Sequence, residues 1–217
     1  MDKVELYIKV KEQYEEKYPG HINALKMWKD GRSSHFKLEM SHYVKYLIKG
    51  KVLVVGCGPG HQVFGLNEFG FEGHGCDVSS FAISNAFVPN CKVSDIRKLC
   101  YEDKEFLNVT VFDVLEHLPF DFLNEALKEC ERVTEKIILF RIPFSAKEGT
   151  LSTLGLEDGL KYPTGPTVWQ HYVNQNTQWW ESQFFVVFLK EEWKYTYIKD
   201  SIFGGSSDWH LYRFERR

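Results

Sequence analysis

The first part of the chain carries helical patterns of apolar and charged positions. From 4 to 18, apolar residues recur every three or four positions among lysines and glutamates, and Pro19 and Gly20 follow. A similar pattern runs from 36 to 47 and ends near Gly50. Apolar residues at this spacing fall on one face of a helix, and glycine or Pro-Gly ends it. The pattern predicts two amphipathic helices in a helical N-terminal extension, or cap, over residues 1–50.

After residue 50, short apolar runs alternate with helical patterns. Several runs are apolar on both faces, as in the buried strands of a parallel sheet. The expected strands are 52–55, 73–78, 91–95, 109–115 and 136–142, and the expected helices are 61–69, 79 or 80 to about 87, and 122–133. This alternation predicts an α/β fold, with a doubly wound, Rossmann-like and mostly parallel sheet.

The last third of the chain follows a different pattern. Residues 145–173 hold four glycines and two prolines without a clear period, and connections of this length are usually functional or disordered. We expect a lid-like insertion there, and then a helix with an aromatic face at 178–189. Alternation on both sides of the turn 204–207 predicts a C-terminal antiparallel hairpin, which completes a seven-stranded sheet in a domain spanning 51–217.

Composition excludes several classes of protein. Lys and Arg total 27 against 30 Asp and Glu, so no global positive field exists to attract nucleic acid or anionic lipid. The longest apolar run, 184–189, has six residues, whereas a membrane-spanning helix needs about 20. The N-terminus lacks an apolar signal segment. We therefore expect a soluble, cytoplasmic protein without a membrane partner.

The cysteines do not suggest a disulfide framework. There are five of them, an odd number, and no Cys-x-x-Cys pair, which fits neither disulfide-rich domains nor a zinc ribbon. They are Cys57, Cys76, Cys91, Cys100 and Cys130. We expect them to be small buried apolar residues.

A glycine-rich turn supplies the strongest chemical signal. Gly56, Gly58 and Gly60 follow the expected strand 52–55 and precede a helical pattern, so a nucleotide-like ligand could approach the backbone closely. Asp77, at the end of the next strand, stands where a carboxylate can accept both ribose hydroxyls. This pair of features indicates an adenosine cofactor. A dinucleotide fingerprint would need glycine where His61 stands, so NAD is disfavoured.

The segment VLVVGCGPG resembles the first motif of the class I S-adenosylmethionine-dependent methyltransferases, typically Val-Leu-Asp-x-Gly-x-Gly-x-Gly. The resemblance covers residues 51–144 and implies S-adenosyl-L-methionine as cofactor. Val54 departs from the motif, because the family usually has there an acidic residue that helps hold the methionine ammonium. The cofactor-binding residues that the resemblance implies are Gly56, Cys57, Gly58, Gly60, Asp77, Val78, Asp95, Ile96, Asp113 and Val114. Arg32 and His35 could reach the cofactor carboxylate in the manner of a family cap.

The acceptor site is expected at the end of strand 109–115, the switch point of the sheet. A hydroxyl acceptor must lose its proton as it attacks the methyl group, so a histidine near neutral pKa is a natural base. His117 and His171 are both candidates, and Glu116 joins them in the expected catalytic set. The aromatic residues Trp169, Tyr172, Trp179 and Trp180 could form a flat-walled site for a sugar or an aromatic ring.

The favoured function is O-methylation of a small molecule or glycan. The alternatives are an NAD(P)-dependent oxidoreductase and a non-catalytic S-adenosylmethionine-binding protein. A DNA base is disfavoured, because residues 113–116 read Asp-Val-Leu-Glu rather than Asp/Asn-Pro-Pro-aromatic. RNA or protein stays open as acceptor, although the basic cluster at 213–217 is small. We expect no metal, since Glu116 and His117 alone supply too few ligands, and the oligomeric state stays open.

Overall fold

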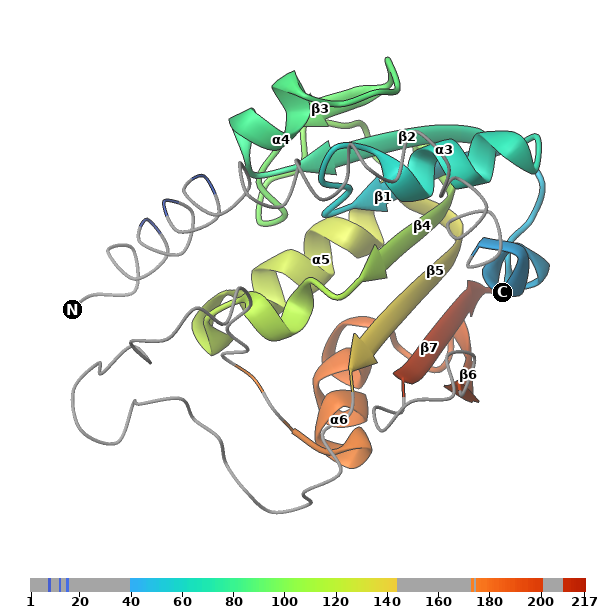
Figure 1. The fold of residues 1–217 in the computed structure, drawn as a ribbon. Coiled ribbons are helices and arrows are strands. Elements are labelled where there is room, and N and C mark those ends of the chain that lie inside the picture. Colours follow the sequence, from blue (N-terminus) through green and yellow to red (C-terminus); the bar gives the residue numbers. More distant parts are fainter. Residues whose placement is uncertain are drawn as a thin grey trace.

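The computed structural model describes Ile8, Glu12, Glu15, residues 40–143, Val173, and residues 175–200 and 209–217. Its centre is a seven-stranded sheet in the order β3-β2-β1-β4-β5-β7-β6 (Figure 1). The strands are β1 (Lys51–Val55), β2 (Glu72–Asp77), β3 (Cys91–Val93), β4 (Phe106–Phe112), β5 (Thr134–Pro143), β6 (Trp193–Asp200) and β7 (Trp209–Arg216). The predicted fold class is confirmed.

The strand pairing places a switch point between β1 and β4. β1 pairs in parallel with β2 on one side and with β4 on the other, so the chain winds outward from this pair in both directions. β7 runs antiparallel to both β5 and β6, as the sequence predicts. Because ligands of open α/β sheets bind where the strand order reverses, the carboxyl ends of β1 and β4 are the place to look for a site.

β4 lies three residues earlier than predicted, over Phe106–Phe112 rather than 109–115. It ends where it does because Asp113 has a φ of +59°, a left-handed conformation that no strand residue adopts. The chain then turns into a short 3-10 helix, η2 (Leu115–His117).

The helices connect the strands as expected. They are α3 (His61–Glu68), α4 (Ser80–Ser84), α5 (Leu123–Val133) and α6 (Thr177–Val187), with 3-10 turns η1 (Val44–Tyr46) and η3 (Phe120–Phe122). α4 ends about three residues earlier than predicted, because the Asn85 side chain donates to the carbonyl oxygen of Phe81 and competes with further helix. The three described residues of the predicted helix 4–18 are helical.

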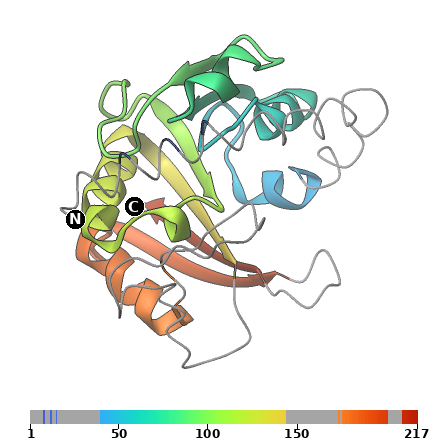
Figure 2. The same ribbon diagram turned by 60° about the vertical axis from the view of Figure 1, so that its left-hand side comes forward.

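The sheet is buried on both faces, and β1 shows how. Leu53 and Val55 pack into an apolar cluster with α5 and α6, whereas Val52 and Val54 pack into a second cluster with α3 and with Met40 and Tyr43. Successive strand side chains point to opposite faces, so an all-apolar strand serves both clusters. Figures 1 and 2 show α5 and α6 on one side of the sheet.

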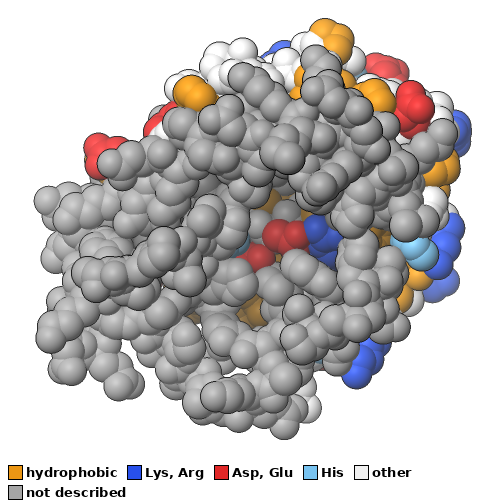
Figure 3. All heavy atoms as spheres, in the orientation of Figure 1, with side chains coloured by type: hydrophobic (Ala, Val, Ile, Leu, Met, Phe, Trp, Pro, Cys, Tyr) orange, Lys and Arg blue, Asp and Glu red, His pale blue; other side chains and the backbone are white. Residues whose placement is uncertain are grey.

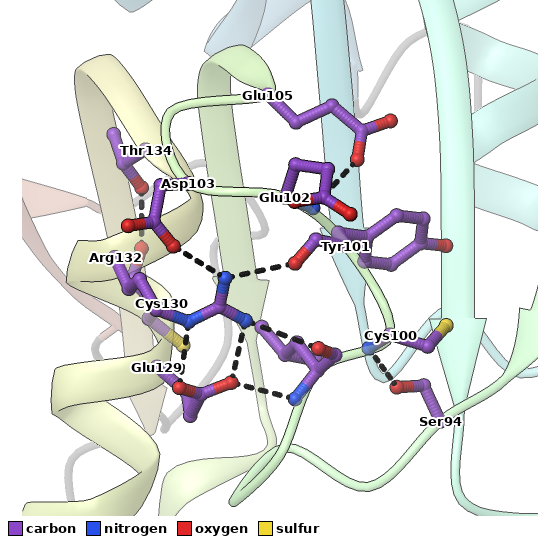
Figure 4. A network of polar contacts seen from close by, with 11 residues as sticks. Ser94, Cys100, Tyr101, Glu102, Asp103, Glu105, Glu129, Cys130, Arg132 and Thr134 are labelled. Carbon is purple, nitrogen blue, oxygen red and sulfur yellow. Dashed lines mark hydrogen bonds and ion pairs between the residues drawn. The ribbon is translucent and has the colours of Figure 1, made fainter.

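Arg132, near the end of α5, ties the connection before β4 to that helix (Figure 4). Its guanidinium donates to the carboxylates of Glu129 and Asp103 and to the carbonyl oxygen of Tyr101, with donor–acceptor distances of 2.8 Å. Glu129 in turn accepts the backbone N–H of Leu99 at 2.8 Å. The network fixes this connection at the amino end of β4.

The expectation for the cysteines holds for three of them. Cys57, Cys76 and Cys130 are buried, but Cys91 is half-buried and Cys100 is exposed. Cys100 is exposed because it lies in the irregular connection before β4 rather than on a strand or helix. Among the described helices, none combines the length and the hydropathy needed to cross a membrane.

Candidate cofactor and acceptor site

The turn between β1 and α3 is built so that only glycine fits at several positions. Gly56, Gly58 and Gly60 have φ angles of +74°, +53° and +96°, where residues with a Cβ are strained. A Cβ on Gly56 would lie 2.3 Å from Val114 Cγ2, and one on Gly60 would lie 2.4 Å from Val88 Cγ2. The turn therefore presents bare backbone at the carboxyl end of β1.

Asp77 joins this turn to the end of β2. Its side chain is 6% exposed, and its carboxylate accepts the N–H of Gly58 on Oδ2 and the N–H of Ser79 on Oδ1, both at 2.9 Å. The backbone N–H groups of Gly56 and Cys57 also donate to the carbonyl oxygen of Cys76. The glycine turn and the Asp77 carboxylate thus form one rigid unit.

The unit fits an adenosine cofactor with a methionine tail. Bare backbone allows close approach, and a carboxylate stands beside it for the ribose. α3 begins at Gly60 without a side-chain cap, and a helix N-terminus favours an anionic group such as a cofactor carboxylate. Val54 is 1% exposed and packs in an apolar cluster, so it supplies no counter-charge for an ammonium.

Two other expected cofactor residues lie beyond β3. Asp95 follows the strand and forms an isolated bridge with Lys98, and its carboxylate accepts the Arg97 guanidinium at 2.7 Å. Ile96 is buried, and Val78, the residue after β2, is half-buried. The Asp95 carboxylate, expected to hold the adenine, is thus paired with Arg97 in this structure.

Asp113 and Val114 come directly after β4, and Asp113 pairs with an arginine that the sequence analysis did not select. Arg141, on β5, forms an ion pair with the Asp113 carboxylate and donates from Nη1 to the Tyr43 hydroxyl at 3.0 Å. The sequence does mark Arg141. After Lys136, it is the one charged residue in the apolar run KIILFRI. The pair fixes the chain at its turn out of the sheet.

Glu116, on η2, is a buried acid without a hydrogen-bond partner. It is 1% exposed, and among the described residues nothing donates to either of its carboxylate oxygens. The pKa of Glu116 is raised well above its ordinary value, first by burial and then by the nearby Asp113 carboxylate, against the opposing effect of Arg141. Such a group costs free energy unless a ligand satisfies it.

His117 is the next residue and completes an acid–imidazole pair. Its Nε2 lies 3.8 Å from Glu116 Oε1, and the imidazole is buried. Together these two side chains place a carboxyl group and an imidazole side by side in a buried place. Such a pair can accept a proton from a bound hydroxyl.

The two halves of the site touch each other. The close approach of Gly56 to the Val114 side chain places the segment 113–117 directly against the glycine turn. In the view of Figure 3, acidic side chains and a Lys or Arg side chain lie next to one another near the middle of the molecule. The expected cofactor turn and the expected acceptor segment are therefore neighbours.

The aromatic residues divide between core and surface. Trp180 packs against Phe184 inside the cluster under β5, so the expectation that it lines an acceptor pocket is wrong. Trp179 is half-buried and contacts Phe120, with ring centroids 5.7 Å apart. Trp169, His171, Tyr172, Arg32 and His35 lie outside the described residues, as do the turn 204–207 and most of the insertion 145–173.

Comparisons with known proteins agree with this geometry. A family model described as a methyltransferase domain matches residues 53–137. The PH0226 protein from Pyrococcus horikoshii OT3 is 23% identical, with 85% of this chain and 90% of that chain covered and a TM-score of 0.61. An S-adenosylmethionine-dependent methyltransferase structure from Methanosarcina mazei is 15% identical, with 80% and 96% covered and a TM-score of 0.58.

A third structure is magnesium protoporphyrin IX methyltransferase from Synechocystis PCC 6803 with bound S-adenosylhomocysteine. It is 15% identical, with 86% of this chain and 82% of that chain covered and a TM-score of 0.57. No curated protein sequence matches the chain.

The fold is a Rossmann-like, mostly parallel sheet, with a glycine turn bonded to Asp77 at the carboxyl ends of its central strands. The methyltransferase-domain family model matches the segment that holds the glycine turn, β2 and β4, and the seven-stranded sheet has the fold of the similar methyltransferase structures. These matches indicate a methyltransferase enzyme and give no support to the oxidoreductase alternative.

Proposed function

We propose that the protein transfers the methyl group of S-adenosylmethionine to a hydroxyl oxygen of a small molecule or glycan. The observation that carries the proposal is Glu116, a buried carboxyl group without a hydrogen-bond partner among the described residues, next to the expected cofactor turn. A hydroxyl acceptor supplies the donor that this carboxyl group lacks. We also propose that residues 1–50 form a cap on a methyltransferase domain spanning 51–217.

Each proposed cofactor-binding residue would contact a particular part of the cofactor. Asp77 would accept hydrogen bonds from the ribose, the glycine turn 56–60 would lie against the methionine portion, and Asp113 would border it. When bound, the cofactor supplies the activated methyl group on a sulfonium sulfur. The protein's part is to align the acceptor oxygen in line with that methyl group, exclude water and remove a proton.

Glu116 would take the proton. As the acceptor oxygen forms its bond to the methyl carbon and the carbon–sulfur bond breaks, the hydroxyl proton would pass to the Glu116 carboxylate. His117, with Nε2 at 3.8 Å, would share the proton. Burial raises the pKa of Glu116, so in its deprotonated form the Glu116 carboxylate is a stronger base than an exposed one.

A small molecule or glycan is favoured over RNA and protein for two reasons. The chain's formal net charge is −3, which opposes a long phosphate-tracking surface. A structural relative, magnesium protoporphyrin IX methyltransferase, also carries a small-molecule substrate in its name. RNA and protein are the other outcomes that a test must include.

The test is methyl transfer from S-adenosylmethionine labelled in its methyl group to four acceptor panels. These are phenols and catechols, sugars, amines, and RNA with peptides. We expect label in a base-stable ether product from one of the first two panels. Label that appears only in amines, RNA or peptides would contradict the proposed acceptor. Thermal shift checks the cofactor independently, with stabilisation by S-adenosylhomocysteine and none by NADH.

A further inference from the structure

Glu15 makes contacts that its position in the sequence gives no reason to expect. Its carboxylate accepts the Ser79 hydroxyl on Oε2 at 2.9 Å and the Ser80 hydroxyl on Oε1 at 2.9 Å. It also accepts the backbone N–H groups of Ser80 at 2.7 Å and Phe81 at 3.1 Å. Four donors from three consecutive residues thus converge on one acid, which precedes Ser79 by 64 positions.

These donors belong to the start of α4, which begins just beyond Asp77 and Val78. Ser79 is the N-cap, and its hydroxyl oxygen accepts the N–H of Ala82 at 3.1 Å. Glu15 accepts hydrogen bonds from the two N–H groups that the Ser79 side chain does not bond, those of Ser80 and Phe81. The first N–H groups of a helix have no partner within the helix. A residue from the N-terminal extension therefore completes the cap of α4.

The same short turn holds the carboxylate expected to bind the ribose. Ser79 donates its N–H to Asp77 Oδ1 at 2.9 Å and its hydroxyl to Glu15 Oε2 at 2.9 Å. Ser79 is fully buried, so it has little freedom once both bonds are made. Glu15 thereby holds the residue that orients Asp77 against the glycine turn.

The charge state of Glu15 suits this role. Partial burial opposes ionisation, but the hydrogen bonds from Ser80, Phe81 and Ser79 outweigh it and lower the pKa of Glu15. The acid is therefore a carboxylate at neutral pH. Hydrogen bonds to a charged acceptor are stronger than neutral ones.

We propose that Glu15 is a positioning residue for cofactor binding, which acts through Ser79 on the orientation of Asp77. The inference rests on the proposed function, because it takes the cofactor ribose to lie at Asp77. It concerns affinity for the cofactor and leaves the acceptor and the chemistry of transfer to Glu116 and its neighbours. Replacing Glu15 with Ala should therefore raise the KM for S-adenosylmethionine and leave kcat nearly unchanged.

The binding experiment uses the full chain and S-adenosylhomocysteine, titrated by calorimetry. We expect E15A to raise the Kd about 5- to 10-fold, and E15Q to raise it less, because glutamine retains one acceptor oxygen. E12A is the matched control, since Glu12 is exposed and expected to lie on the same helix, and it should leave the Kd unchanged. Equal Kd values for E15A and the wild type would overturn the inference.

Hydrogen exchange separates positioning from local support of α4. In E15A the amides of Ser80 and Phe81 should exchange faster, because they lose their acceptor. The amide of Ser79, which donates to Asp77, should also exchange faster, and bound S-adenosylhomocysteine should slow it in the wild type. Faster exchange at Ser80 and Phe81 alone would overturn the inference. A wild-type protein that does not bind S-adenosylhomocysteine would contradict the cofactor assignment itself, which is a different result from equal affinity.

Discussion

The two ends of β4 hold charged groups that are built in opposite ways. At the amino end, Arg132 donates to two carboxylates and to backbone carbonyl oxygens, and Glu129 accepts from both Arg132 and the backbone (Figure 4). At the carboxyl end, Glu116 is more deeply buried and has no hydrogen-bond partner among the described residues. Among the described residues, one cluster has all its hydrogen-bond partners and the other does not.

This difference distinguishes a cluster that stabilises the fold from one that is available to a ligand. A satisfied ion-pair network stabilises the connection that it joins and offers nothing to a ligand. A buried acid without a partner destabilises the folded chain, and such groups persist where function requires them. An acid with a shifted pKa is therefore a candidate functional residue when it lacks hydrogen-bond partners in the protein. By this criterion we propose a role in the reaction for Glu116 and a structural role for Arg132.

The largest expected effect comes from the glycine turn beside the incomplete cluster. Gly58→Val places a β-branched residue at a φ of +53° and next to the bond that Gly58 donates to Asp77. We expect the Kd for S-adenosylhomocysteine to rise more than 100-fold by calorimetry. Gly70→Val is the control, because Gly70 also has positive φ, +69°, but meets the flexible Lys49 side chain. Equal losses of affinity in both variants would mean that strain alone is responsible.

Glu116→Gln tests the chemical role of the incomplete cluster. Glutamine keeps the size of the side chain but cannot take the acceptor proton, so we expect kcat to fall about 100-fold while the Kd for S-adenosylhomocysteine stays within about threefold. Glu125→Gln, on the exposed side of α5, should leave kcat unchanged. Steady-state kinetics with saturating cofactor measures both. A kcat near the wild-type value for Glu116→Gln would remove Glu116 from the reaction.

Arg132→Ala should lower stability and leave kcat unchanged, the reverse of what we expect for Glu116→Gln. Loss of several charge-assisted hydrogen bonds should lower the free energy of unfolding by about 2–3 kcal/mol, and Tm by about 4–12 °C for a chain of this size. Denaturant titration and scanning calorimetry measure these changes. The kcat per folded molecule should not change. A large loss of kcat without a loss of stability would show that this cluster also serves the reaction.

The smallest effect is a dependence of stability on pH. The pKa of Glu116 is raised in the folded state, first by burial and then by Asp113, so the folded chain binds the proton more tightly than the unfolded chain. Its contribution is fully present below the ordinary pKa of a glutamate and is lost as pH rises through the folded-state pKa. Relative to Glu116→Gln, the wild type should lose up to about 1.4 kcal/mol per pH unit across that window. Parallel pH profiles of unfolding would contradict the raised pKa.

Much of the fold follows from local patterns in the sequence. The apolar runs at 52–55 and 136–142 predicted β1 and β5 within a few residues, and the turn 56–60 was read from its glycines alone. The end of β4 could not be predicted, because it depends on the positive φ of Asp113, which Arg141 fixes from another strand. The place of Trp180 in the core likewise depends on packing between α6 and β5.

The candidate site was only partly predictable for a similar reason. Asp77 ends β2 and Glu116 follows β4, both recognisable positions, and the structure brings those segments together. Glu15 and Arg141 act across long separations in sequence, 64 residues to Ser79 and 28 to Asp113. Without the fold, nothing marks a surface glutamate in a charged helix as the cap of a helix beyond β2.

The most direct test of the account is a crystal structure with S-adenosylhomocysteine. We predict that Asp77 will lie within hydrogen-bond distance of both ribose hydroxyls, with the glycine turn 56–60 against the methionine portion and Glu116 facing the sulfur side of the crevice. A ligand bound elsewhere, or an Asp77 carboxylate that does not reach the ribose, would contradict the account.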